Sequence, residues 1–124
     1  EKNMCKTLAH KSIDPNGQPV TINIEMPHVS EGNISISYFI RINRSTVPFI
    51  TGDNISISDD SKMEISKSPA ELVGKLMQID FYLLGVLDSK KSFSYEVFQG
   101  NVSLAPKVTH NCSQALNTCV FLFK

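Results

Sequence analysis

Apolar and polar residues alternate along much of this chain with a period of two. The longest alternation is Asn33–Asn43, where every even position is Ile or Tyr and most odd positions are Asn, Ser or Arg. Val20–Met26 shows the same pattern and is followed by Pro27. Because successive side chains of a β-strand point to opposite faces of its sheet, both segments are predicted to be strands with one buried face.

Shorter alternations predict further strands, separated by residues typical of turns. They lie at Ile55–Ile57, Met63–Ile65, Phe93–Val97 and Asn101–Leu104. Val120–Phe123 is predicted to be a terminal strand with apolar residues on both faces. Ser45–Asp53 contains a proline and a glycine and is predicted to be a loop or an edge segment. Asp14–Gly17 reads Asp-Pro-Asn-Gly, a strong turn sequence. Asp88–Ser92 is polar and is predicted to be a hairpin loop.

Two segments break the alternation. Ile79–Leu87 is almost entirely apolar, which predicts a central strand covered on both faces. Ser68–Glu71 reads Ser-Pro-Ala-Glu, which combines a helix-capping serine, a proline suited to the first helical position and a glutamate three residues after the serine. Apolar residues then follow at helical spacing, so one or two helical turns are predicted within 69–77.

About eight short strands at a spacing of roughly ten residues predict an all-β fold, an antiparallel two-sheet β-sandwich formed by a single domain over 1–124. An α+β fold with one short helix is the alternative. The sandwich would be immunoglobulin-like in general architecture, but the chain has no Trp, and Asn117 stands where that family has Tyr before its second cysteine. A family of lipid-binding sandwiches is similar in size and strand content, but its several disulfides have no counterpart here.

Five Asn-x-Ser triplets without a central proline are potential acceptors of N-linked glycans. They begin at Asn33, Asn43, Asn54, Asn101 and Asn111. Composition alone, with nine asparagines and 21 serines and threonines among 124 residues, predicts about 1.5 such triplets. The excess favours a secreted or cell-surface glycoprotein whose binding surface avoids the first four acceptors. The fifth triplet contains Cys112, so disulfide formation would compete with glycan transfer there.

The three cysteines are Cys5, Cys112 and Cys119. In an oxidising compartment at least one disulfide is expected. The short spacing favours a Cys112–Cys119 bond, which leaves Cys5 unpaired, buried or bridging to a second chain. A bond from Cys5 to either of the other two is the alternative, because the geometry of the fold decides the pairing.

Charge argues against nucleic acid as a partner, and hydropathy argues against a membrane-spanning segment within the chain. Lys and Arg number 12, Asp and Glu number 12, and only two residues are Arg, so no basic stripe for nucleic acid is expected. The chain contains no run of about 18 apolar residues that could span a membrane. A membrane anchor that follows Lys124 is compatible with the sequence. The chain begins at Glu1 without an apolar signal segment, so we expect any signal to have been removed.

No constellation of residues predicts catalysis, a cofactor or a bound metal. The histidines lie in predicted loops without metal-ligand spacing: His10, His28 and His110. Cys112 follows the last of them by two residues, but an expected disulfide argues against a catalytic thiol. Asp53, Asp59 and Asp60 flank one short strand and are the single set considered for calcium, although turn-forming roles account for them.

Recognition is the function class that remains, and the chain is not expected to be an enzyme. We expect an extracellular domain that binds a protein partner, in adhesion, as a receptor or in immune modulation, through aromatic side chains on a glycan-free face. The predicted contact residues are Phe39, Arg41, Arg44, Phe49 and Tyr82. The alternative is a carrier of a small hydrophobic ligand or lipid bound between the two sheets.

Overall fold

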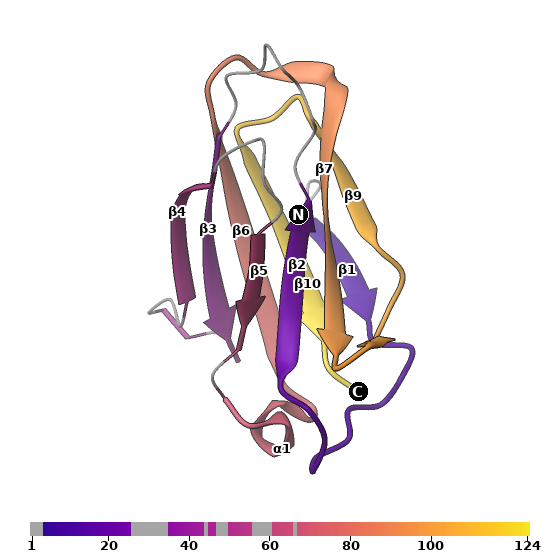
Figure 1. The fold of residues 1–124 in the computed structure, drawn as a ribbon. Helices are drawn as coiled ribbons and strands as arrows, with labels where there is room; N and C mark the ends of the chain where they lie inside the picture. Colours follow the sequence, from indigo (N-terminus) through magenta and orange to yellow (C-terminus); the bar gives the residue numbers. More distant parts are fainter. Residues whose placement is uncertain (1–3, 26–34, 44, 47–49, 56–60, 66) are drawn as a thin grey trace.

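The computed structural model describes residues 4–25, 35–43, 45–46, 50–55, 61–65 and 67–124. The strands form two sheets packed face to face (Figure 1), which confirms the predicted all-β two-sheet sandwich. Sheet A contains, in spatial order, β1 (Met4–Leu8), β10 (Leu116–Leu122), β6 (Leu76–Leu84), β3 (Ser35–Ile42) and β4 (Ile50–Ile55). Sheet B contains β5 (Ser61–Glu64), β2 (Val20–Glu25), β7 (Asp88–Gln99) and β8 (Val102–Ser103), with β9 (Val108–Cys112) also paired to β7.

The order of strands along the chain differs from that of immunoglobulin domains. In those domains the last two strands are consecutive in sequence and neighbours in one sheet. Here β10 and β6 are neighbours in sheet A, but β7, β8 and β9 of sheet B lie between them in sequence. The first strand, β1, runs parallel to the last, β10, whereas the other described pairs are antiparallel. The described residues therefore show the two packed sheets of the predicted general architecture, without showing an immunoglobulin strand order.

The core lies between the sheets and is built from the alternation seen in the sequence. In β2 and β3 the even-numbered residues are buried, as predicted, and the odd-numbered ones are mostly more exposed. The interior is filled by aromatic rings: the centroid of Phe81 lies 5.1 Å from that of Phe93 and 5.6 Å from that of Tyr95. Phe121 and Phe123 form a second contact, with centroids 5.1 Å apart.

The apolar run Ile79–Leu87 is central in its sheet, but the prediction that both its faces are covered was wrong. Strand β6 lies between β10 and β3, and its outward side chains Tyr82 and Leu84 are 40% and 51% exposed. The predicted hairpin loop at Asp88–Ser92 was also wrong, because β7 begins at Asp88. The connection is Gly85–Leu87, and it carries the chain from sheet A to sheet B.

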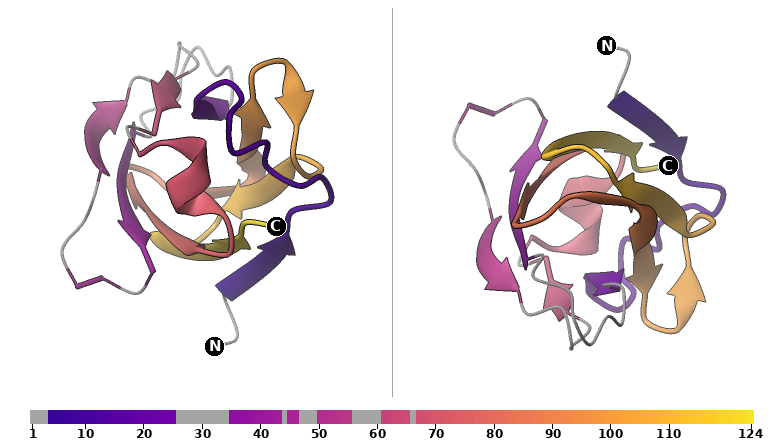
Figure 2. Two further views of the ribbon diagram at one scale, coloured as in Figure 1. Left: turned by 90° about the horizontal axis from the view of Figure 1, so that it is seen from below. Right: turned by 90° about the horizontal axis from the view of Figure 1, so that it is seen from above.

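The predicted short helical turn within 69–77 is confirmed. Helix α1 (Pro69–Leu72) begins after Ser68, whose hydroxyl donates to the carboxylate of Glu71 at 3.1 Å. Gly74 has a φ of +75°, a conformation that favours glycine, and the chain then enters β6. Figure 2 shows α1 across one end of the sandwich. In the described part of the chain, no helix is long and apolar enough to cross a membrane.

Other local predictions had mixed outcomes. The turn Asp14–Gly17 is confirmed: the amide of Gly17 donates to the carbonyl of Asp14 at 3.0 Å. Ser45–Asp53 was expected to be a loop or an edge segment, and residues 50–53 belong to β4, one of the two edge strands of sheet A. Strands β1 and β9 were not predicted. The predicted strand residue Ile57 lies outside the described residues.

Candidate functional site on sheet A

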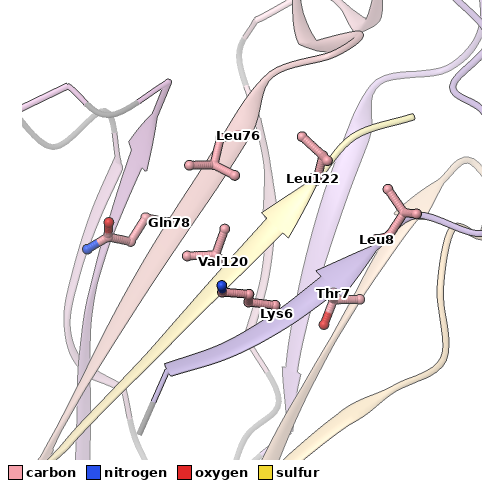
Figure 3. A pocket seen from close by; sticks show the side chains of 7 residues that line it. All are labelled: Lys6, Thr7, Leu8, Leu76, Gln78, Val120 and Leu122. Atoms are coloured by element: carbon pink, nitrogen blue, oxygen red, sulfur yellow. The ribbon is translucent and has the colours of Figure 1, made fainter. Parts of the chain in front are cut away.

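The face of sheet A that points away from sheet B, called here the outer face, is ordered in rows by the pairing of its strands. The first row, counted from the start of β6, is a leucine row, with Leu76 on β6, Leu122 on β10 and Leu8 on β1 directly opposite one another. The next row carries Gln78, Val120 and Lys6 on the same three strands. These rows line a shallow depression of about 610 Å³ (Figure 3).

The leucine row is more exposed than is favourable for apolar side chains. Leu8 is 52% exposed and Leu122 is 40% exposed, although β10 is an interior strand of its sheet. Val120 and Leu76 are half-buried beside them. Contiguous apolar surface of this kind marks sites of association in soluble proteins.

A second apolar area lies at the other end of the same face. The rings of Phe39 and Tyr82 meet edge to face, with centroids 5.4 Å apart. Tyr82 pairs across the sheet with Leu116, which is 45% exposed, and Leu84 lies two residues further along β6. The area therefore joins strands β3, β6 and β10.

A buried carboxylate separates the two apolar areas. Asp80 accepts hydrogen bonds from Arg41 Nη1 at 2.5 Å and from Thr118 Oγ1 at 2.8 Å. Gln78 Nε2 adds a third donor at 3.2 Å. Asp80 is 7% exposed although it lies on the outer face, because these neighbours cover it. The centre of the face thus has a fixed polar network in which Arg41 is paired.

The outer face of sheet B has the opposite character. Its described residues on β2, β5, β7 and β9 are polar apart from Phe98: Thr21, Asn23, Glu25, Lys62, Glu64, Ser92, Ser94, Glu96, Thr109 and Asn111. Lys107 and Glu25 form an ion pair there at 2.6 Å. Only the outer face of sheet A therefore combines exposed leucines with aromatic rings on interior strands, among the residues described.

The structure brings three of the five predicted contact residues together. Phe39, Arg41 and Tyr82 all lie on the outer face of sheet A, whereas Arg44 and Phe49 lie outside the described residues. The leucine row was missed. Its signal was present in the sequence, since Val120–Phe123 is apolar at consecutive positions and cannot bury both of its faces in one core.

Four of the five potential glycan acceptors lie within the described residues. Asn101 and Asn111 are exposed, the former between β7 and β8 and the latter on β9, so both belong to sheet B. Asn43 is exposed at the end of β3, and its amide donates to the carbonyl of Leu76. Asn54 lies on the edge strand β4, and Asn33 is outside the described residues.

The disulfide joins Cys5 to Cys119, so the favoured Cys112–Cys119 pairing was wrong. Strands β1 and β10 place Cys5 and Cys119 directly opposite, with Cα atoms 4.6 Å apart. Cys112 lies on β9 of the other sheet and is a buried free thiol. Burial, followed by the nearby charge of Asp88, raises the pKa of the Cys112 thiol, so the reactive thiolate is disfavoured.

His110 and Asp53 lie on strands rather than in the predicted loops and turns, whereas His10 lies in a loop as predicted. His110 lies on β9 rather than in a loop, stacked on Phe93 with centroids 5.2 Å apart. Its Nε2 lies 4.0 Å from Cys5 Sγ. His10 is exposed beyond β1, and His28 lies outside the described residues. Of the aspartates considered for calcium, Asp53 is on β4 and the other two are outside the described residues.

Comparison of the chain with protein-family models, with curated proteins and with solved structures found no significant match.

Proposed function

We propose that this chain is an extracellular recognition domain that binds a protein partner through the outer face of sheet A. The observation that carries the proposal is the contrast between the two sheets. The outer face of sheet A exposes Leu8, Leu122, Tyr82 and Leu84, whereas that of sheet B is polar. Aromatic and apolar side chains clustered on a rigid sheet are typical of the anchors of protein interfaces.

The extracellular placement is supported by the cysteines and by the glycan acceptors. A disulfide between the first and last strands is compatible with an oxidising compartment. Asn43, Asn101 and Asn111 are exposed, as acceptors of a bulky glycan must be. Adhesion, receptor and immune-modulating roles all share this placement and this mode of recognition.

The potential glycan acceptors also limit which part of the outer face of sheet A a partner can cover. Asn101 and Asn111 lie on sheet B, Asn54 lies on the far edge strand β4, and Asn43 borders the leucine row from the side of β3. The area free of acceptors is therefore centred on β6, β10 and β1. A glycan at Asn43 would form its rim.

The chemistry of this area defines the complementary partner. On this face Arg41 is already paired with Asp80, whereas Lys6 is exposed and forms no ion pair with another described residue. The partner surface that fits has an apolar centre facing the leucine row and a carboxylate opposite Lys6. Such a pair at the rim contributes to association rate and specificity more than to affinity.

The carrier alternative has weaker support. Aromatic rings pack between the sheets at centroid distances of 5.1 to 5.6 Å, which leaves the space around Phe81 filled by Phe93 and Tyr95. The depression bordered by the leucine row is open to solvent on one sheet face, unlike an enclosed lipid cavity.

The test is a binding screen followed by matched variants. The chain, expressed in a eukaryotic host and made multivalent, is screened against an array of individually expressed cell-surface ectodomains. Leu122→Asp should abolish binding to the partner found, because it places a charge in the leucine row. Thr109→Asp, an exposed position on β9 of sheet B, is the matched control and should bind as the parent does.

A glycan placed on the face provides a second, independent variant. Lys6→Asn combined with Leu8→Thr creates an acceptor at position 6, and the attached glycan should block the partner sterically. Equal loss of binding in the Leu122→Asp and Thr109→Asp variants, with both folded by circular dichroism, would contradict the proposed face. Retained binding in the glycan variant, with glycan occupancy established by mass spectrometry, would contradict it as well.

A further inference from the structure

Three potential metal ligands from three strands converge where the edges of the two sheets meet. Cys5 lies on β1, Cys119 on β10 and His110 on β9, the last of which belongs to sheet B. Their two Sγ atoms and the ligand nitrogen of His110 lie within 4.8 Å of one another. Sulfur and imidazole nitrogen are the ligand atoms that zinc favours in proteins.

We propose that reduction of the Cys5–Cys119 disulfide converts this cluster into a zinc site with Cys5, Cys119 and His110 as its protein ligands. A dithiol reductant supplies two electrons and two protons to the Sγ–Sγ bond and leaves as its own disulfide, so both cysteines become thiols. Zn²⁺ then displaces one proton from each thiol, and two Zn–S bonds form with the release of two protons. Nε2 of His110 donates its lone pair to the metal and loses no proton.

The geometry allows this with small movements. In a tetrahedral zinc site the Zn–S bonds are about 2.3 Å and the Zn–N bonds about 2.0 Å, so neighbouring ligand atoms lie roughly 3.5–3.8 Å apart. Cys5 Sγ and His110 Nε2 are 4.0 Å apart, close to that separation. The two sulfur atoms move apart when their bond breaks, while the pairing of β1 with β10 keeps their backbones adjacent. Three protein ligands leave the fourth position to water.

Tyr95 supports the site from outside the ligand set. Its hydroxyl donates to Cys119 Sγ at 2.8 Å, and the ring is fully buried. Burial raises the pKa of Tyr95, while a hydrogen bond with Thr7 opposes that shift, so the phenol stays protonated and remains a donor. A hydrogen bond to a metal-bound thiolate stabilises its negative charge. Tyr95 is therefore a positioning residue in this proposal.

Access and protonation also suit the cluster. Cys5 on β1 and His110 on β9 are half-buried, whereas Cys119 on β10 is buried. Burial lowers the pKa of His110, which favours the neutral imidazole that binds metals. The cluster lies between the sheets, so the site does not depend on the recognition face.

The experiment titrates the full chain with Co²⁺ and then Zn²⁺. The chain is reduced with dithiothreitol, which is removed under anaerobic conditions. Reduced protein should bind one Co²⁺ per chain, with thiolate-to-cobalt charge transfer and the visible bands of a tetrahedral site, and one Zn²⁺ should displace it. Oxidised protein should not give these bands.

Matched variants separate ligation from folding. His110→Phe keeps a ring against Phe93 but removes the nitrogen ligand, and should lose the tetrahedral bands. Tyr95→Phe should weaken zinc affinity roughly 10- to 100-fold, and Cys112→Ala should bind as the parent does. Parental affinity in His110→Phe, or loss of binding in Cys112→Ala, overturns the proposal. If circular dichroism shows that reduction unfolds the chain, recovery of the fold on zinc addition supports the site, and no recovery overturns it.

Discussion

The guanidinium of Arg41 lies 2.5 Å from the carboxylate of Asp80, across strands β3 and β6 in the middle of the outer face of sheet A. The two partners are not equivalent. Asp80 is the more buried one and accepts two further hydrogen bonds, from Thr118 and Gln78. The carboxylate is thus the centre of the network, and the guanidinium is one of three donors to it.

This network leads to a prediction about stability. Asp80→Ala leaves Arg41, Thr118 and Gln78 without their acceptor and should lower the free energy of unfolding by about 1.5–3 kcal/mol. Arg41→Ala leaves the buried carboxylate without its counter-charge, although Thr118 and Gln78 still donate to it, and should also cost about 1.5–3 kcal/mol. Urea unfolding of both variants measures the two losses. Unchanged stability in Asp80→Ala would contradict the central role of Asp80.

Two adjacent leucines test whether the exposed apolar surface contributes to folding. Leu83 is 4% exposed in the core and Leu84 is 51% exposed on the outer face. Leu83→Ala should cost about 2–5 kcal/mol, because it leaves a cavity in the core. Leu84→Ala should change stability by about 0.5 kcal/mol or less. A large loss in Leu84→Ala, measured by denaturant unfolding, would mean that the face is packed by the chain itself rather than left for a partner.

The strands with one apolar face were predictable, because in β2 and β3 the alternation of apolar and polar residues matches the alternation of buried and more exposed positions. Strands β1 and β9 were not, since their sequences, Met-Cys-Lys-Thr-Leu and Val-Thr-His-Asn-Cys, carry no clear apolar face. Each is held by pairing with one neighbour, β1 with β10 and β9 with β7. Backbone hydrogen bonding fixes such strands and leaves little trace in the pattern of side chains.

The long-range features of the candidate sites could not be predicted for a related reason. The Cys5–Cys119 pairing depends on the register between the first and last strands, which no local pattern encodes. The leucine row depends on the same register. Phe39, Arg41 and Tyr82 were accessible to sequence reasoning because each lies at a predicted position of its own strand. The missed residues become a surface only when three strands are aligned.

The occupancy of the potential glycan acceptors tests whether the protein passes through the secretory pathway. Asn43, Asn101 and Asn111 are exposed, and Cys112 does not compete through a disulfide for the last triplet. Protein from a eukaryotic host should therefore carry glycan at all three, and peptide N-glycosidase should convert each to aspartate, adding about 1 Da per site. Peptide mass spectrometry measures this. The same protein made in a host without N-glycosylation is the control, and a full-length mass unchanged by the enzyme would contradict the secreted placement.

The Cys5–Cys119 disulfide should stabilise the fold, and Cys112 should be an unreactive thiol in the folded chain. Cys5→Ala combined with Cys119→Ala removes a crosslink over 114 residues of sequence separation, and by the chain-entropy estimate should cost about 4.7 kcal/mol. Cys112 is buried with a raised pKa, so iodoacetamide should label it only after unfolding. Non-reducing peptide mapping and alkylation before and after denaturation check both statements. A Cys112-linked dimer or rapid labelling of folded protein would contradict them.

Stability should fall at mildly acidic pH because of His110. Burial lowers the pKa of His110 in the folded chain below its ordinary value of 6.5. As the pH falls through about 6.5, the unfolded chain therefore binds a proton before the folded chain does, and the free energy of unfolding decreases. The contribution is complete above that pH and is lost progressively below it. Tyr95 and Cys112, whose pKa values are raised, do not change charge in this range.

Urea unfolding at about pH 7.5 and about pH 5.5 measures the effect. His110→Phe preserves the ring contact with Phe93 and cannot be protonated, so its stability should change less between the two pH values than that of the parent. His10 is exposed, and His10→Ala should keep the parental dependence. An identical pH dependence in the parent and in His110→Phe would show that the imidazole is protonated equally in the folded and unfolded chains, contrary to its burial beside Phe93 and the disulfide.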